Sequence, residues 1–334
     1  MIKVAINGFG RIGRPTFKKL IENSNIEVAA INDLTDTKTL AHLLKYDSVY
    51  GIYEKNIGHT DKEIKVDGKE FQILAEKDPA KLPWKKLGID VVLECTGFFT
   101  DYEGAKKHLA AGAKKVIISA PCKGVEVPTY VFGGNEEKYN SEKDNVISMG
   151  SCTTNCVVPV AKVINDGFEI EKALMTTIHS YTSTQRIVDG PHKDLRRGRT
   201  AAVNIIPTTT GAAISVVRVL PELEGKLDGI AIRVPSPIIS LIDFTAQVKK
   251  STSFDDVNKV FKQAGQKDLK GILAVEDMPL VSTDFIGNSH SAIIDNQFTK
   301  VEGSNLIKVL AWYDNEWAYA CRLAEMAEYI GNKL

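Results

Sequence analysis

The chain has 334 residues, of which 43% are hydrophobic and 25% are charged, and it carries 42 basic and 42 acidic side chains. A globular chain of this length exceeds one ordinary hydrophobic core, so we predict two domains. Its balanced charge argues against nucleic acid as the primary partner, and no apolar run reaches the length of a membrane helix.

The N-terminal stretch MIKVAINGFG has no basic segment followed by a long apolar run, so we expect no signal peptide. The five cysteines are an odd number without the spacing of a disulfide framework, which favours a reducing cytoplasm. Since no two cysteine pairs have the spacing of zinc ligands, we expect no metal site.

Short strands alternate with helices in the first half of the chain. The expected elements are a strand at 2–7, a helix to about 23, a strand at 26–32, a helix at 37–46, a hairpin turn at 66–69, a strand at 91–95, a helix at 103–112, and strands at 115–119 and 146–149. This βαβ rhythm predicts an α/β domain with a doubly wound, Rossmann-type parallel sheet.

Longer alternating strands dominate the second half. We expect strands at 173–181, 227–234, 241–249, 290–295 and 306–313, with helices at about 152–165, 253–265 and 315–331. The pattern predicts an α+β domain with a mostly antiparallel sheet. We place the first domain at 1–150, joined by the C-terminal helix 316–334, and the second domain at 151–315.

The segment GFGRIG (8–13) fits the dinucleotide-binding pattern G-x-G-x-x-G. It follows a predicted strand and opens a helix, and Asp33 stands 20 residues past Gly13, which is the context that makes this pattern specific. Gly8 permits the tight turn, and Gly10 lets the backbone approach a pyrophosphate. The backbone N–H groups of Arg11 and Ile12 would face the phosphates. A carboxylate at Asp33 favours NAD over NADP.

The segment SCTTNC (151–156) places two cysteines one helical turn apart at a strand–helix junction. Cys152 stands in the first turn, where unpaired N–H groups and the helix dipole are expected to lower its pKa and make it the nucleophile. Cys156 lies further in and is expected to be a buried apolar residue. His179 closes the strand 173–181 and is the candidate base for the thiol.

Other histidines and basic residues have plainer interpretations. His42, His59 and His108 fall on helices or loops without an evident partner, and we expect them at the surface. The loop 182–202 is rich in Arg, Lys and Thr, and Arg233 ends another strand. Together with the hydroxyl-rich turn at 207–213, these residues favour a substrate that carries phosphate.

These motifs resemble the glyceraldehyde-3-phosphate dehydrogenase family along the whole chain. The matching segments are INGFGRIGR, INDL at 31–34, LLKYDS at 43–48, SCTTN, HSYT at 179–182, HKDLRRGR at 192–199, NIIPTTTGAA at 204–213, RVPSP at 233–237 and WYDNEW at 312–317. SCTTNC is the most specific. The resemblance implies oxidation of D-glyceraldehyde 3-phosphate to 1,3-bisphosphoglycerate with NAD and inorganic phosphate, in glycolysis or gluconeogenesis.

The resemblance also implies roles for individual residues. Cys152 would form a thiohemiacetal and then a thioester, and His179 would lower the pKa of the thiol and accept the hemiacetal proton. Thr182 and Arg233 would hold the substrate phosphate. The inorganic-phosphate site would comprise Ser151, Thr153, Thr210, Gly211 and one arginine of the pair Arg196–Arg197, for which we choose Arg197. Cofactor contacts would be added by Lys77, Ser119 and Asn315.

Family resemblance further implies a cytoplasmic homotetramer. An erythrose-4-phosphate dehydrogenase that hydrolyses its thioester is the alternative, because HSAIID and DNEWAY occur in such relatives as well. Those relatives tend to lack the threonine after HSY and the TTTG turn. Thr182 and Thr210–Gly211 are present here, which favours glyceraldehyde 3-phosphate.

Overall fold

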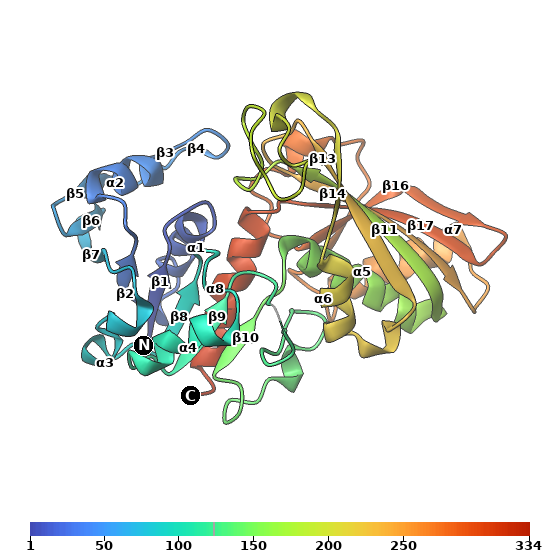
Figure 1. The fold of residues 1–334 in the computed structure, drawn as a ribbon. Coiled ribbons are helices and arrows are strands. Elements are labelled where there is room, and N and C mark those ends of the chain that lie inside the picture. Colours follow the sequence, from blue (N-terminus) through green and yellow to red (C-terminus); the bar gives the residue numbers. More distant parts are fainter. Residues whose placement is uncertain (123) are drawn as a thin grey trace. The chain divides into compact units, whose positions relative to one another are not determined.

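A computed structural model describes residues 1–122 and 124–334. The chain divides into two compact units (Figure 1). The first unit comprises Met1–Tyr130, Glu137–Gly150 and Ala320–Leu334, and the second comprises Val131–Glu136 and Ser151–Tyr319. Among the described residues, no helix has both the length and the apolar character needed to cross a membrane.

The first unit is built on an eight-stranded sheet in the order β10-β9-β8-β1-β2-β7-β6-β5. Neighbouring strands from β10 to β7 pair in parallel, whereas β7, β6 and β5 pair antiparallel. The strand bounds are β1 Ile2–Asn7, β2 Ile26–Asn32, β5 Ile57–His59, β6 Glu63–Val66, β7 Lys69–Leu74, β8 Val91–Glu94, β9 Lys115–Ile118 and β10 Val146–Ser148. The central strands are short and buried, as expected for a parallel sheet covered on both faces.

Helices and one small hairpin complete this unit. Its elements are α1 Gly13–Leu20, α2 Thr37–Lys45, β3 Tyr46–Asp47, β4 Gly51–Ile52, α3 Trp84–Leu87, α4 Tyr102–Ala110 and the greater part of α8 Trp317–Gly331. Side-chain amides of Asn23 and Asn25 donate to the Glu328 carboxylate of α8 at 2.7 and 2.9 Å. Between β6 and β7, Asp67 and Gly68 both have positive φ, which confirms the predicted two-residue hairpin turn.

The second unit is built on a seven-stranded sheet in the order β12-β13-β11-β14-β17-β16-β15. Four of its six neighbouring pairs are antiparallel, and the pairs β11–β13 and β15–β16 are parallel. The strand bounds are β11 Ile170–Ser180, β12 Ile206–Thr209, β13 Leu227–Val234, β14 Ser240–Val248, β15 Leu273–Glu276, β16 Ala292–Glu302 and β17 Leu306–Tyr313. These two sheets confirm the predicted fold class.

One apolar core lies between this sheet and the helices α5 Cys152–Phe168, α6 Ala212–Val219 and α7 Phe254–Gln266. Alternating residues of β11, β14 and β17 enter that core, for example Met175 and Phe244. The intervening residues of β11 form the opposite face, where Leu174 is 67% exposed. At the predicted hydroxyl-rich turn, 207–209 belong to β12 and only the residues that follow form the turn into α6.

Candidate active site

Cys152 is the first residue of α5, and a reciprocal cap fixes that helix end. Ser151 Oγ accepts the backbone N–H of Thr154 at 3.0 Å, and Thr154 Oγ1 accepts the backbone N–H of Ser151 at 3.1 Å. Because the cap sets the backbone of the first turn, it also sets the direction of the Cys152 side chain. Cys156 is fully buried one turn further along, as expected.

His179 lies beside the thiol. Its Nε2 is 3.5 Å from Cys152 Sγ, and its Nδ1 is 2.7 Å from both the Ser180 carbonyl oxygen and Arg233 Nη1. Arg233 reaches this point because it pairs with His179 across β11 and β13, and its Nη1 also donates to the Ser180 carbonyl at 2.8 Å. When Nδ1 carries the ring proton and donates it to that carbonyl, the Nε2 lone pair faces the thiol, and Arg233 Nη1 then bonds the carbonyl rather than Nδ1.

The electrostatics of the pair correct the prediction that the helix end lowers the pKa of Cys152. Burial raises the pKa of the Cys152 thiol, and the Arg233 guanidinium and the Thr153 hydrogen bonds only oppose that effect. Burial is also the main reason that the pKa of His179 falls to about 3, with Arg233 adding to it. The ligand-free protein therefore holds a thiol beside a neutral imidazole, since both charged forms lose hydration.

Tyr313 packs against the Cys152–His179 pair, a role that was not predicted from the sequence. It is buried at the end of β17, its ring meets the His179 ring edge-on, and its hydroxyl bonds Thr153 Oγ1 at 3.0 Å and Thr177 Oγ1 at 2.9 Å. The strand 306–313 is apolar apart from Lys308, and the two-residue period of a strand places position 313 on the face opposite that lysine. The identity of its partners depends on three segments that meet only in the fold.

Arg197 and Arg196 differ in their surroundings. Arg197 Nε donates to Thr208 Oγ1 at 2.9 Å, and its Nη2 donates to the Thr209 carbonyl at 3.2 Å. Its positive charge contributes to the lowered pKa of His179. Arg196 is exposed, and its backbone N–H donates to the Asp194 carboxylate. Of the two arginines, Arg197 is the one held against β12.

The remaining phosphate candidates of the second unit lie at loop and helix ends. Thr182 is partly buried, and its backbone N–H donates to Gln185 Oε1 at 3.3 Å. Thr210 Oγ1 accepts the backbone N–H of Ala212 at 3.1 Å, and Gly211 is the N-cap of α6. Exposed backbone at a helix N-terminus favours an anion there.

Asn315 is buried just before α8. Its Oδ1 accepts hydrogen bonds from Ser180 Oγ and Ser240 Oγ, each at 3.1 Å. Ser240 Oγ in turn accepts the backbone N–H of Ser180 at 3.1 Å. The Asn315 carboxamide is therefore tied to the residue that follows His179.

The glycine loop of the first unit has the close backbone contacts that a dinucleotide site requires. Gly8 has a φ of +96°, and a Cβ at Gly13 would stand 2.1 Å from the Gly8 carbonyl oxygen. At Gly10 a Cβ would meet no atom within 4 Å, so this position opens outward. Asp33 Oδ2 accepts the backbone N–H of Phe9 at 2.8 Å. These residues fit a bound dinucleotide.

The other cofactor candidates surround that loop within the first unit. Ile12 is the N-cap residue of α1, which is not capped by any side chain of the described residues. Arg11 Nη1 pairs with the Asp47 carboxylate at 2.5 Å. Lys77 is exposed in the segment after β7, and Ser119 directly follows β9.

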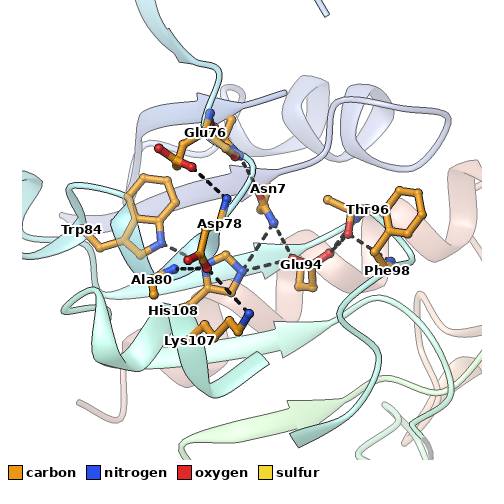
Figure 2. Close-up of polar contacts among 11 residues, drawn as sticks. Asn7, Glu76, Asp78, Ala80, Trp84, Glu94, Thr96, Phe98, Lys107 and His108 are labelled. Atoms are coloured by element: carbon orange, nitrogen blue, oxygen red, sulfur yellow. Dashed lines mark hydrogen bonds and ion pairs between the residues drawn. The ribbon is translucent and has the colours of Figure 1, made fainter. Parts of the chain in front are cut away.

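His108 contradicts the prediction of a surface histidine, because its side chain is completely buried. It lies on α4 among Trp84, Glu94 and Asn7, as Figure 2 shows. Its partners come from other segments of the chain, which is why the helix pattern alone did not place it. Across residues 1–122 and 124–334, no group of three or more His, Cys, Asp or Glu side chains is arranged to hold a metal ion.

A Rossmann-type unit with a glycine loop, together with a unit in which a partly buried cysteine lies beside a buried histidine, is typical of a nucleotide-dependent enzyme that uses a reactive thiol. The model of the glyceraldehyde 3-phosphate dehydrogenase NAD binding domain matches residues 2–102, and that of the C-terminal domain matches residues 151–315. The chain belongs to the glyceraldehyde 3-phosphate dehydrogenase family, which confirms the resemblance seen in the sequence, and it is an NAD-dependent oxidoreductase.

Full-length relatives support the same assignment. The chain is 53% identical over 332 residues to the glyceraldehyde-3-phosphate dehydrogenase of Priestia megaterium, and 52% identical over 332 residues to that of Geobacillus stearothermophilus. It is also 52% identical over 332 residues to glyceraldehyde-3-phosphate dehydrogenase 1 of Bacillus subtilis. Each match covers 99% of both chains.

Proposed function

We propose that this protein oxidises D-glyceraldehyde 3-phosphate with NAD and inorganic phosphate to 1,3-bisphosphoglycerate, as a step of glycolysis or gluconeogenesis. The observation that carries the proposal is the 3.5 Å contact between Cys152 Sγ and His179 Nε2, with Arg233 against the same imidazole, in a member of this family. The relatives named for glyceraldehyde 3-phosphate do not favour erythrose 4-phosphate as the substrate.

The first step follows from the protonation states of the pair. Because the resting forms are a thiol and a neutral imidazole, His179 Nε2 accepts the thiol proton as Cys152 Sγ attacks the aldehyde carbon. The same proton then passes to the aldehyde oxygen and gives a neutral thiohemiacetal. The backbone N–H of Cys152 at the start of α5 and the His179 ring are the donors available to that oxygen.

The second step oxidises the thiohemiacetal to a thioester. NAD, when bound, supplies the hydride acceptor. His179 takes the hydroxyl proton as the carbon loses its hydride, and the Cys152–carbon bond remains. Inorganic phosphate then attacks the thioester carbonyl, the carbon–sulfur bond breaks and the acyl phosphate leaves. The Cys152 thiolate takes the proton from His179, which restores the thiol and the neutral imidazole for the next turnover.

Two groups of residues are assigned to the two phosphates. We place Thr182 and Arg233 at the substrate phosphate, and Ser151, Thr153, Arg197, Thr210 and Gly211 at the inorganic phosphate. Support for Arg197 over Arg196 comes from its bonds to β12 and from its effect on the pKa of His179. Support for the α6 end comes from the exposed backbone at Gly211.

We assign cofactor binding to Gly8, Gly10, Arg11, Ile12, Asp33, Lys77, Ser119 and Asn315. Within this set, Gly8, Gly10 and the helix start at Ile12 would hold the pyrophosphate, and Asp33 would accept the adenosine ribose hydroxyls. Since Asp33 already accepts the Phe9 N–H through Oδ2, its other oxygen is better placed for the ribose. Asn315 would bind the nicotinamide carboxamide.

We also propose that the protein is a cytoplasmic homotetramer. Support for self-association comes from the bare face of the second sheet, which exposes Leu174, Ile230 and Leu306. A hollow of about 390 Å³ opens on this face. Its lining residues are Lys172, Ala173, Leu174, Thr176, Asp243, Thr245, Gln247 and Leu306. A second copy of the chain is the occupant that this mixed apolar and polar surface suits.

One assay tests the reaction. Purified protein is mixed with glyceraldehyde 3-phosphate, and NADH formation is followed by absorbance with NAD or NADP, and with phosphate present or absent. We expect turnover that requires both NAD and phosphate. Equal turnover without phosphate would indicate thioester hydrolysis, and a Cys152→Ser variant with full activity would contradict the covalent mechanism.

A further inference from the structure

Three neighbouring parallel strands of the first unit end in buried polar residues that the mechanism above does not use. They are Asn32 at the end of β2, Asn7 at the end of β1 and Glu94 at the end of β8, and each is at most 5% exposed. Asn7 is in register with Asn32 on one side and with Glu94 on the other. We refer to these three residues as the strand-end row.

The row is connected on one side to the segment after β7. The Glu76 backbone N–H donates to Asn32 Oδ1 at 2.8 Å, and Asn32 Nδ2 donates to the Glu76 carbonyl at 2.9 Å. Asn32 Nδ2 also donates to Asn7 Oδ1 at 2.7 Å, and Asn7 Nδ2 donates to Glu94 Oε2 at 2.5 Å. Since a backbone N–H can only donate, the orientation of both amides is fixed.

On the other side the row holds the segment after β8. Glu94 Oε1 accepts the backbone N–H of Thr96 at 2.8 Å and the Thr96 hydroxyl, and Thr96 Oγ1 accepts the backbone N–H of Phe98 at 3.1 Å. One continuous set of hydrogen bonds therefore joins the segment after β7 to the segment after β8 (Figure 2).

His108 and Trp84 complete the row from within the unit. Trp84 Nε1–H donates to His108 Nδ1 at 2.9 Å, so that nitrogen carries no proton and Nε2–H is free to donate to Glu94 Oε2 at 3.1 Å. Glu94 thus receives hydrogen bonds from His108, Asn7 and Thr96. A carboxylate buried without exposure needs such donors, because it has lost its water.

The row lies directly behind the glycine loop. Gly8 follows Asn7, Asp33 follows Asn32, and a Cβ at Gly8 would meet the Thr96 nitrogen at 2.7 Å. In the sheet, β2 and β7 lie on one side of β1. The next strand in the chain, β8, lies on the other side of β1, so the strand order reverses at β1. Ligands of open parallel sheets bind outside the strand ends where the order reverses in this way.

We propose that Asn32, Asn7 and Glu94, supported by His108 and Trp84, are positioning residues for the dinucleotide. They fix the segments after β7 and β8 on either side of the glycine loop before the cofactor binds. This inference rests on the proposed function in one respect, namely that the ligand of this loop is NAD. The row itself touches neither the thiol nor the substrate candidates, all of which belong to the second unit.

Substituting Glu94→Gln tests the proposal with almost no change in side-chain volume. The amide nitrogen of the new side chain would face either the Thr96 donors or the donors of Asn7 and His108. Two donors cannot form a hydrogen bond, so the contacts on that side of residue 94 are lost. We expect the Kd for NAD, measured by calorimetric titration of the full-length protein, to rise about tenfold. The KM for NAD should rise with it, while kcat at saturating NAD changes less.

Two further variants make the test decisive. Thr96→Val lies on the partly exposed segment after β8 and keeps the side-chain shape, so it should fold and still raise the Kd for NAD. Tyr130→Phe is the matched control, because it removes the partly buried hydrogen bond from Tyr130 to Asp144 in the same unit and leaves the row intact. We expect its Kd for NAD to equal that of the wild-type protein.

The outcomes separate the two proposals. Higher Kd values for Glu94→Gln and Thr96→Val, with an unchanged value for Tyr130→Phe, support the positioning role. Unchanged Kd values in both row variants, even with a lower melting temperature, would overturn it and leave the row with a purely structural role. Failure of the wild-type protein to bind NAD at all would instead contradict the proposed cofactor.

Discussion

A single buried imidazole determines how the thiol is activated. His179 faces Cys152 with one nitrogen and faces Ser180 and Arg233 with the other, and its pKa is lowered to about 3. At neutral pH the imidazole is therefore uncharged, and one ring nitrogen has a lone pair that can accept a proton. In the mechanism that we propose, Cys152 is therefore deprotonated when the aldehyde is attacked, with His179 as its general base rather than as a permanent counter-ion.

His179 also predicts a dependence of stability on pH. Its pKa in the folded protein is lower than the ordinary value of 6.5, so the unfolded chain binds the proton more tightly. The resulting stability is present above pH 6.5 and is lost as the pH falls toward 3, by roughly 1.4 kcal/mol per pH unit. Urea unfolding at pH 7, 5.5 and 4.5 should show a smaller loss for His179→Gln than for the wild type. Parallel losses would contradict this.

Arg233 predicts a shift in the reactivity of the thiol. Its positive charge is the strongest of the effects that favour the Cys152 thiolate against burial. Replacing it in Arg233→Gln should raise the pKa of Cys152 further, so the rate of alkylation by iodoacetamide should reach its midpoint at a higher pH. Arg233→Lys keeps a charge on the same strand and serves as the control. An unchanged midpoint in Arg233→Gln would show that its charge does not act on the sulfur.

At the scale of the elements, two glycines of one loop give opposite predictions. A Cβ at Gly13 would clash with the Gly8 carbonyl at 2.1 Å, so Gly13→Ala must push α1 away from the end of β1. We expect a lower melting temperature and loss of NAD binding together. At Gly10 the Cβ has room in the ligand-free protein. Gly10→Ala should therefore keep the melting temperature and weaken only NAD binding, as measured by thermal unfolding and titration.

The elements also show what the sequence alone could predict. The strands predicted at 227–234 and 306–313 have those bounds in the structure, and Ser253 caps α7. The 290–295 strand prediction was too short, because β16 continues to Glu302 through an irregularity in its pairing with β17. The local sequence does not predict where a strand ends when that end depends on pairing with another strand.

The candidate site divides in the same way. Motif spacing was enough to choose Cys152 and His179 as partners, and the structure places them in contact. Burial was not predictable, because it depends on what other segments cover: it reverses the expected pKa shift of Cys152 and moves His108 from the surface into the interior. Tyr313 was missed for the same reason, since Thr153 and Thr177 come from distant segments.

At the scale of the whole molecule, the second sheet presents two unlike faces. One is covered by α5, α6 and α7, and the other exposes alternate residues of β11 such as Leu174 and Thr176. The helices bury one face of the sheet. On the other face, apolar side chains of β11, β13 and β17 stay exposed to water in the single chain. The self-association proposed above would remove these side chains from water.

The bare face predicts how the proposed self-association can be disrupted. Leu174 is 67% exposed on β11, so Leu174→Asp leaves the fold of the chain intact and places a charge where a second copy would bury it. We expect light scattering after size-exclusion chromatography to give a multiple of the chain mass for the wild type and a lower mass for the variant. Lys138→Gln, on an exposed turn of the first unit, lowers the net charge by the same one unit and is the charge-matched control. A wild-type protein that elutes as a single chain would refute self-association, and an unchanged mass for Leu174→Asp would place the interface elsewhere.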